Sequence, residues 1–370
     1  MSKIRYESVL VEQALAGEYG LKLGAYLQQM SGLNDIKPLV HDFERDFAAY
    51  IGVKHAVAVN SGSDALAMIL RAAGVKKGDE VIIPDLTYHA VALAVVYCGA
   101  RPVFVDAGPD DLLLDLDALA RAVTVRTKVI IAAHMFGRAC DMVALQELCH
   151  KKGIILVEDV CQAESSTLNG RRLGSFGDFG AFSFSYYKPL SSCGGGGGMV
   201  VYNDDKYRHI ARWMEDWRDD PSLLKLGQRF SPMSLMDLVA LRVKFAHLKK
   251  IIAARKNIKV LYEKELSKIP SMEIFKDRAG EDSVPQNFVV CCDHRDALMD
   301  FLSIHGVLAQ NPYTPLHAMS AYRKFLRGDF PVSDAYYGRA LHLPLYSFMS
   351  REKAFQITDL CRKFLKDKCC

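Results

Sequence analysis

Lys188 is the residue of this 370-residue sequence whose surroundings most suggest chemistry. It lies in "AFSFSYYKPLSSCGGGGGMVV" (181–201), as one basic side chain among apolar, aromatic and glycine residues. If this segment is buried, an ammonium group there is costly unless it is paired or loses its proton. Either the segment is a surface loop, or Lys188 performs chemistry.

A candidate phosphate site lies earlier in the chain, in "NSGSDAL" (60–66). Gly62 and Ser63 fall where an apolar strand ends and where a helix that begins near Asp64 leaves backbone N–H groups unpaired. Such a helix start binds phosphate readily. The alternative is a serine that only caps the helix, because serine is a favoured N-cap residue.

The stretch "IILVEDVCQAE" (154–164) supplies candidate carboxylates. Glu158 and Asp159 end an apolar strand, and Gln162 follows three residues after Asp159. His134 ends another strand, in "AAHMFG". Taken alone, the acidic pair also fits a helix cap, and the histidine also fits a hydrogen-bonded core residue.

Spacing argues against two other kinds of site. The glycine run 194–198 contains G-x-G, but it lacks the preceding strand and following helix of a dinucleotide fingerprint. It therefore indicates either a backbone that closely approaches a ligand or a flexible turn. The cysteine pairs 291–292 and 369–370 have no suitably spaced second pair, so we expect no metal site.

Together, the candidate groups match the needs of pyridoxal 5'-phosphate. This cofactor requires a helix N-terminus for its phosphate, an anion beside its pyridinium nitrogen and an amine that forms a Schiff base. The glycine–serine helix start, a carboxylate at a strand end and Lys188 supply these three groups. A lysine bound in this way is no longer a free ammonium in an apolar place, which accounts for Lys188.

The elements that must position these groups alternate in type. From residue 55 to 159, β-branched runs such as "DEVIIP" and "KVIIAAH" alternate with helical patterns such as "SDALAMILRAAG". This predicts an α/β fold with a mostly parallel sheet flanked by helices and a ligand site at the carboxyl ends of the strands. Residues 204–265 read as long helices. We predict a large cofactor-binding domain at 1–245 and a smaller C-terminal α+β domain at 246–370.

Composition limits the partners and the compartment. The chain has 47 Lys+Arg and 43 Asp+Glu, with no long basic run, so acidic small molecules are more plausible partners than nucleic acid. No apolar run approaches the roughly 18 residues of a membrane span, and no signal peptide is apparent, so we expect a cytoplasmic protein without membrane contact. Ten cysteines scattered through apolar segments predict mostly reduced core residues.

Six motifs follow one another along nearly the whole chain. They are "FERDFAAYIGVKHAVAVNSGSDAL", "IPDLTYHAV", "AAHMFGRACDM", "VEDVCQAESSTLNGRRLGSFGDFGAFSFSYYK", "PYTPLHAMSAYR" and "ALHLPLYSFMS". This ordered set resembles the DegT-like (DegT/StrS-type) aminotransferases of nucleotide-linked sugars, which belong to fold type I of the pyridoxal phosphate enzymes, the aspartate-aminotransferase-like fold. The resemblance implies amino transfer from L-glutamate to a keto group of a nucleotide-linked sugar, in a homodimer.

The resemblance also implies a role for each site residue. Lys188 corresponds to the Schiff-base lysine and proton carrier, and Asp159 to the partner of the pyridinium nitrogen. The other implied cofactor contacts are Gly62, Ser63 and Ser183 at the phosphate, Gln162 at the ring's hydroxyl side, Tyr88 on one ring face and Cys161 on the other.

The chain departs from the family pattern in two places. Cys193 and five glycines replace a G-E-G-G turn after the lysine. The family asparagine that reaches the partner subunit's phosphate is absent, and only Gln228, Arg229 and Ser231 lie nearby. We expect Arg229 or a neighbour to make that contact, because arginine forms charge-assisted hydrogen bonds to phosphate.

Two further expectations concern the acceptor and the assembly. Trp213, Trp217, Arg218 and Arg229 either hold a nucleotide base and diphosphate or belong to an amphipathic helix and a loop. The helix expected near 235–260 has more apolar positions than one small domain needs to cover, which predicts a symmetric dimer.

Two alternatives to an aminotransferase stay open. A sugar dehydratase of the same family carries histidine in place of the Schiff-base lysine, so Lys188 argues against that class. A non-catalytic regulatory member of the fold would not need Lys188, Asp159 and Ser183 together.

Overall fold

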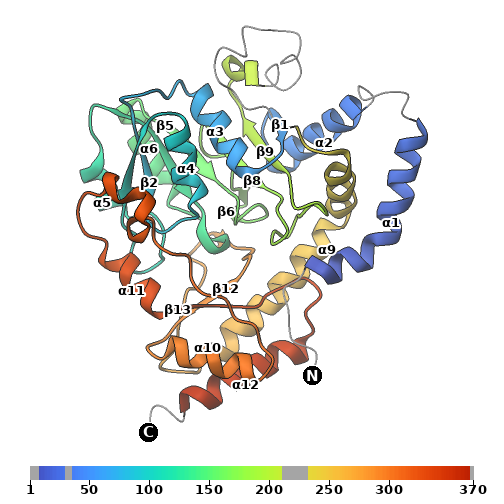
Figure 1. Ribbon diagram of the computed structural model, residues 1–370, viewed down its shortest axis with the longest axis vertical. Coiled ribbons are helices and arrows are strands. Elements are labelled where there is room, and N and C mark those ends of the chain that lie inside the picture. Colours follow the sequence, from blue (N-terminus) through green and yellow to red (C-terminus); the bar gives the residue numbers. More distant parts are fainter. Residues whose placement is uncertain (1–7, 30–35, 211–231, 367–370) are drawn as a thin grey trace.

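A seven-stranded sheet forms the centre of the molecule (Figure 1). The computed structural model describes residues 8–29, 36–210 and 232–366. The strands lie in the order β1 (His55–Val59), β9 (Gly198–Tyr202), β8 (Phe179–Ser183), β5 (Ile155–Asp159), β4 (Thr127–Ala133), β2 (Glu80–Pro84) and β3 (Arg101–Val105). Strand β9 is antiparallel to both of its neighbours, and the other pairs are parallel. The predicted α/β fold with a mostly parallel sheet is confirmed.

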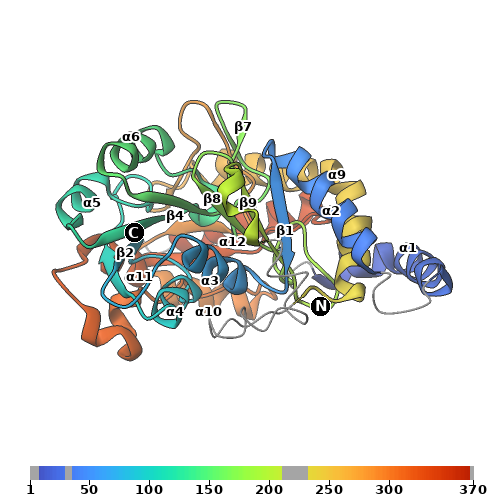
Figure 2. The same cartoon turned by 90° about the horizontal axis from the view of Figure 1, so that it is seen from above.

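Helices cover both faces of the sheet, because alternate strand residues are apolar on both sides (Figure 2). Val81 and Ile83 of β2 pack in one core with α3 and α4, whereas Ile82 packs in a second core with α5 and α6. Helices α2 and α9 cover the β1–β9–β8 end of that second face. These helices are α2 (Ile36–Ile51), α3 (Gly62–Ala72), α4 (Ala90–Tyr97), α5 (Leu116–Ala122), α6 (Met142–Lys152) and α9 (Leu235–Leu266).

A smaller antiparallel sheet follows the large one, which confirms the expected C-terminal α+β region. Its strands lie in the order β10 (Glu273–Ile274), β12 (Phe288–Cys291) and β13 (Ala340–Leu343). Helices α10 (Arg295–Ile304) and α12 (Arg351–Lys366) share an apolar core with this sheet and the end of α9. Figure 1 shows this unit in orange and red beneath the large sheet.

Helix α9 contributes to two cores, one between the large sheet and α2 and one inside the smaller C-terminal unit. Leu238 and Leu241, near its start, pack with α2 and the large sheet, whereas Ile258 and Tyr262, near its end, pack in the small core. The apolar stripe of this helix is therefore covered largely within one chain, so the stripe by itself does not call for a dimer. Since α9 passes through residue 245 without a break, the division into 1–245 and 246–370 stays a prediction about where two domains meet.

The residues at which two helices begin differ from the sequence prediction, because N-cap side chains determine where each helix starts. Helix α3 begins at Gly62, two residues before Asp64, because Ser61 is its N-cap and accepts a hydrogen bond from the Asp64 N–H. Long helices were predicted for residues 204–265. In the described part of this range, the structure has a short 3-10 turn at Asp205–Tyr207 and then α9, whose N-cap is Ser234.

The remaining elements lie around these two sheets. They are α1 (Ser8–Gln29), the small sheet of β11 (Glu281–Asp282), β6 (Thr167–Leu168) and β7 (Arg171–Arg172), and α11 (Pro331–Arg339). Short 3-10 turns lie at Met135–Gly137, Leu316–Ala318 and Ser320–Phe325. Within the described ranges, no helix combines the length and the apolar character needed to cross a membrane.

Candidate active site

A cavity of about 460 Å³ opens at the carboxyl ends of the parallel strands. Strand ends and the helix starts that follow them meet here, as expected for an α/β sheet. The eight residues expected to contact the cofactor all line this one cavity: Gly62, Ser63, Tyr88, Asp159, Cys161, Gln162, Ser183 and Lys188.

The start of helix α3 forms one wall of the cavity, and Gly62 lets it approach the sheet closely. A Cβ atom at Gly62 would lie 2.8 Å from both Cys161 Sγ and Ser183 Cβ. Glycine is therefore the residue that fits between the ends of β5 and β8. Ser63 and Ser183 line the cavity beside this first turn, so N–H groups and hydroxyls converge as a phosphate would require.

The two acidic residues at the end of β5 have different surroundings. Glu158 is fully buried and accepts hydrogen bonds from the N–H groups of Gly174, Phe176 and Gly177, at 2.7–2.8 Å. Asp159 lines the cavity, and its Oδ1 accepts the N–H of Cys161 at 3.0 Å. Asp159 is thus the carboxylate available to a ligand, whereas Glu158 fixes the turn that leads into β8.

His134 lines the cavity, and both of its ring nitrogens are engaged in buried hydrogen bonds. Its Nδ1 accepts the N–H of Cys140 at 3.1 Å, so Nε2 carries the proton that it shares with Glu158 at 3.0 Å. Both side chains are fully buried. Full burial and these hydrogen bonds favour a hydrogen-bonded core histidine, one of the two alternatives that the sequence left open.

Gln162 and Cys161 lie on the loop that follows β5. The Gln162 Oε1 atom accepts the N–H of Phe136 at 3.1 Å, which leaves the amide NH₂ as the donor of a side chain that lines the cavity. Cys161 also lines the cavity, and burial raises the pKa of its thiol well above the usual range. Cys161 therefore contributes a small, uncharged side chain to the lining of the cavity.

Tyrosines surround Lys188 and the cavity mouth. Tyr88 is 47% exposed, and its ring meets that of Tyr313 edge-on, with centroids 6.3 Å apart. Burial raises the pKa of Tyr313 to about 12, so this phenol is neutral. Tyr186 and Tyr187 precede Lys188 and are 45% and 54% exposed.

Lys188 is half-buried, and its amine has a partner that the sequence did not indicate. Nζ donates to Oε1 of Gln286 at 2.9 Å, across 98 residues of chain. The turn is also held two residues later, where the N–H of Leu190 donates to Glu164 at 3.1 Å. Burial raises the pKa of the Glu164 carboxyl, although the positive charge of Lys188 acts to lower it.

Four cavity-related residues were missed in the sequence: Thr87, Glu164, Gln286 and Tyr313. Thr87 and Glu164 lie within motifs already recognised, so adjacency to Tyr88 and Gln162 was an available signal. Tyr313 also lies within a recognised motif, "PYTPLHAMSAYR", whereas Gln286 comes from the smaller unit and carries no local pattern that points to this cavity.

The residues present fit pyridoxal phosphate. A helix start, a carboxylate and an amine lie around one cavity, as that cofactor requires. In addition, the hydroxyl Oγ1 of Thr87 is buried and has no hydrogen-bond partner among the described residues, although Thr87 lines the cavity. A buried hydroxyl without a partner is unusual, and a bound ligand would supply one.

The glycine run packs against the chain itself. A Cβ atom at Gly198 would lie 2.5 Å from the backbone of Ser61, and one at Gly195 would overlap the ring of Tyr186. Gly195 and Gly197 also have positive φ angles, of 76° and 109°. The run therefore lets the segment after Lys188 pass close to the start of α3.

Several predicted residues lie outside the described part of the chain: Trp213, Trp217, Arg218, Gln228, Arg229 and Ser231. Among the residues that are described, no three His, Cys, Asp or Glu side chains are grouped as a metal site requires.

Comparison with known proteins agrees with this geometry. The model of the DegT/DnrJ/EryC1/StrS aminotransferase family matches residues 27–362. Over 367 residues, the chain is 33% identical to the dTDP-3-amino-3,4,6-trideoxy-alpha-D-glucose transaminase of Streptomyces venezuelae, covering 98% of this chain and 94% of that protein. It is 32% identical over 340 residues to the GDP-perosamine synthase of Vibrio cholerae, covering 87% and 89%. The crystal structure of S. venezuelae DesV in complex with a ketimine intermediate matches with a TM-score of 0.90 and 31% identity, over 99% of both chains.

Proposed function

Because the chain belongs to the DegT/DnrJ/EryC1/StrS aminotransferase family, it is an aminotransferase, and we propose that it uses pyridoxal 5'-phosphate to move an amino group from L-glutamate to a keto group of a nucleotide-linked sugar. The names of the two relatives above support this substrate class, since one is a transaminase of a dTDP-linked sugar and the other makes a GDP-linked amino sugar. The observation that carries the proposal is the meeting of Lys188, Asp159 and the start of α3 around one cavity.

The proposed cofactor contacts follow from where each predicted residue lies in the lining of the cavity. The start of α3, with Gly62 and Ser63, would hold the phosphate together with the Ser183 hydroxyl. Asp159 would pair with the protonated ring nitrogen, and Gln162 would donate to the ring hydroxyl. Tyr88 and Cys161 would contact the two ring faces. When bound, the cofactor supplies an electron sink for the carbon that loses its proton.

Lys188 has two tasks in this proposal. Its Nζ atom would hold the cofactor covalently, and as a free amine it would remove the proton from the donor's α-carbon as a general base. Asp159 acts by charge, because a nearby carboxylate favours the protonated state of its partner. The neutral thiol of Cys161 and the neutral phenol of Tyr313 add no competing charge.

We also propose a homodimer that works in the cytoplasm. The exposed rings of Tyr186 and Tyr187, next to Lys188, support the dimer, since a second chain would cover them and complete the cavity mouth. Buried thiols such as those of Cys140, Cys149 and Cys361 form no disulfide, which suits a reducing compartment.

The test of the function is spectroscopic and then chemical. Purified protein mixed with pyridoxal phosphate should gain a visible absorbance band, and borohydride should fix the cofactor on the peptide that contains Lys188. L-glutamate should remove the band, and a panel of nucleotide-linked keto sugars should then show glutamate-dependent amination. A cofactor fixed on another lysine would overturn the assignment of Lys188.

The same experiment separates the alternatives. A regulatory protein without catalysis would keep the band after glutamate is added. A dehydratase would release water from its sugar and leave the amount of amino sugar unchanged. Lys188→Ala should fold normally but lose turnover, because its amine is the base that the reaction needs.

A further inference from the structure

The segment 283–287 of the smaller unit is held tightly against the large domain. The hydroxyl of Ser166 accepts the N–H of Val284 at 2.9 Å and donates to the carbonyl of Gly137 at 2.6 Å, so one side chain bridges the two units. Gly137, with φ of +82°, leaves no room for a side chain, since a Cβ atom there would lie 2.7 Å from the Val284 carbonyl. The path of the segment beside the cavity is therefore defined by backbone contacts.

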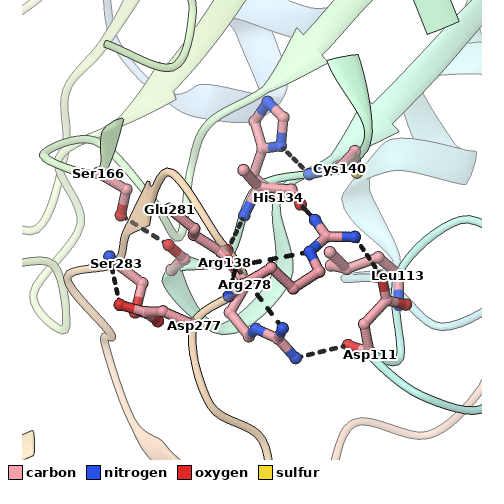
Figure 3. Close-up of polar contacts among 12 residues, drawn as sticks. Asp111, Leu113, His134, Arg138, Cys140, Ser166, Asp277, Arg278, Glu281 and Ser283 are labelled. Carbon is pink, nitrogen blue, oxygen red and sulfur yellow. Dashed lines mark hydrogen bonds and ion pairs between the residues drawn. The ribbon is translucent and has the colours of Figure 1, made fainter. Parts of the chain in front are cut away.

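Polar contacts fix the preceding loop to the same part of the large domain (Figure 3). The Glu281 carboxylate accepts the N–H of Ala139 at 2.5 Å and lies 3.6 Å from the buried guanidinium of Arg138. Arg278 donates to Asp111 at 2.7 Å. The loop that leads to residue 286 thus cannot shift without breaking buried charged contacts, which are costly to lose.

Arg255 of α9 holds the other side of the segment. It is 1% exposed and donates to the carbonyls of Pro285, Gln286 and Leu345, at 3.2, 2.8 and 3.3 Å. Because Arg255 binds the backbone of Gln286, the side chain of Gln286 stays available for the cavity. That side chain is 6% exposed and accepts the Lys188 amine at 2.9 Å.

We propose that Gln286 is a positioning residue, which holds the Lys188 amine in place whenever that amine is not bonded to the cofactor. This inference rests on the proposed function and adds a residue from the smaller unit to it. An amide oxygen suits the task because a neutral acceptor orients the amine but binds it more weakly than a carboxylate would, so the amine can leave to react. The other titratable groups around Lys188 and its cavity are His134, Asp159, Cys161, Glu164 and the cavity tyrosines.

The test follows the attachment of pyridoxal phosphate to cofactor-free protein, by borohydride quenching and mass measurement across a range of pH. Gln286→Leu keeps the size of the side chain and removes the acceptor, and it should slow attachment roughly tenfold, because the amine is no longer oriented. Gln286→Glu keeps the shape and adds charge. It should move the pH midpoint of attachment upward by about one unit, because the carboxylate favours the ammonium form, which does not react.

Gln310→Leu is the matched control, since Gln310 lines the same cavity but has no hydrogen bond to Lys188 in the described structure. It should attach the cofactor at the wild-type rate, and thermal unfolding checks that all variants fold. Wild-type rates and profiles in both Gln286 variants would overturn the inference, as would equal slowing in Gln310→Leu. A wild-type protein that never attaches the cofactor to Lys188 would instead contradict the proposed function itself.

Discussion

Glu158 and Asp159 are neighbours in the chain, yet their carboxylates serve different parts of the molecule. Glu158 accepts three backbone N–H groups of the 174–177 turn and the Nε2–H of His134, whereas Asp159 lines the cavity. Successive side chains of a strand point to opposite faces, and this separation assigns structure to one residue and ligand contact to the other. The two residues should therefore respond differently to the same change from acid to amide.

Asp159→Asn should impair turnover far more than cofactor binding. The amide removes the charge that keeps the ring nitrogen protonated, while the phosphate contacts at α3 remain. We expect kcat to fall by about a hundredfold or more, as for the loss of a preorganised electrostatic contact. Steady-state kinetics and cofactor titration measure the two effects. Asp117→Asn, at an exposed position in α5, is the control, and near-normal turnover in Asp159→Asn would rule out the assigned role.

Glu158→Gln should destabilise the fold. An amide has a single acceptor oxygen, so its NH₂ group would face backbone donors that the carboxylate now accepts. We expect the free energy of unfolding to fall by about 2–4 kcal/mol, as for buried charged hydrogen bonds. Urea unfolding measures it, with the exposed Glu147→Gln as control. An unchanged unfolding midpoint would contradict the structural role.

Gly62→Ala should weaken cofactor binding. The new Cβ atom would lie 2.8 Å from Cys161 Sγ and Ser183 Cβ, so the start of α3 must move away from the sheet. Overpacking of this kind costs about 1–3 kcal/mol, so we expect affinity to fall roughly tenfold or more. Absorbance titration with pyridoxal phosphate measures the change. Gly17→Ala meets nothing within 4 Å and should bind normally; equal affinities in the two variants would show that the close approach is unimportant.

The ion pair between His317 and Asp85 should make stability depend on pH. Burial disfavours the charged imidazole, but hydrogen bonds and charge from Asp85 and Asp334, at 2.7 and 3.0 Å, outweigh it and raise the pKa of His317. A raised pKa means that the folded protein binds the proton more tightly. The contribution to stability is therefore complete below the unfolded pKa of about 6.5 and is lost as pH rises through the folded value.

His317→Gln isolates this contribution. The unfolding free energy of the wild type, measured in urea between pH 6 and 9, should fall toward that of the variant as pH rises. If the difference in unfolding free energy between the two proteins stayed constant or grew as pH rose, the assigned role of His317 would be contradicted.

The proposed dimer predicts twice the mass of one chain in light scattering at working concentration. Tyr186→Ser and Tyr187→Ser together should weaken association, because both rings are exposed next to Lys188. Val143→Ser, at an exposed apolar position on α6, is the control. A fully active monomer would exclude the dimer as a requirement for the cavity.

The sequence by itself determined the fold class and the residues that meet at the cavity. Alternation of β-branched runs with helical patterns predicted the parallel sheet, because hydrophobic periodicity is a local property. The placement of Gly62, Asp159 and Lys188 after strands then predicted that they meet, since parallel strands end at one edge. Their chemical roles remain predictions.

Tertiary structure alone decided which neighbours these groups have. The partner of the Lys188 amine, Gln286, lies 98 residues away on the smaller unit, and no local pattern marks it. Likewise, the apolar stripe of α9 suggested a dimer interface until packing placed its two ends in two cores of the same chain. Long-range contacts depend on how whole elements pack, and a pattern of period 2 or 3.6 records which face is buried but not what buries it.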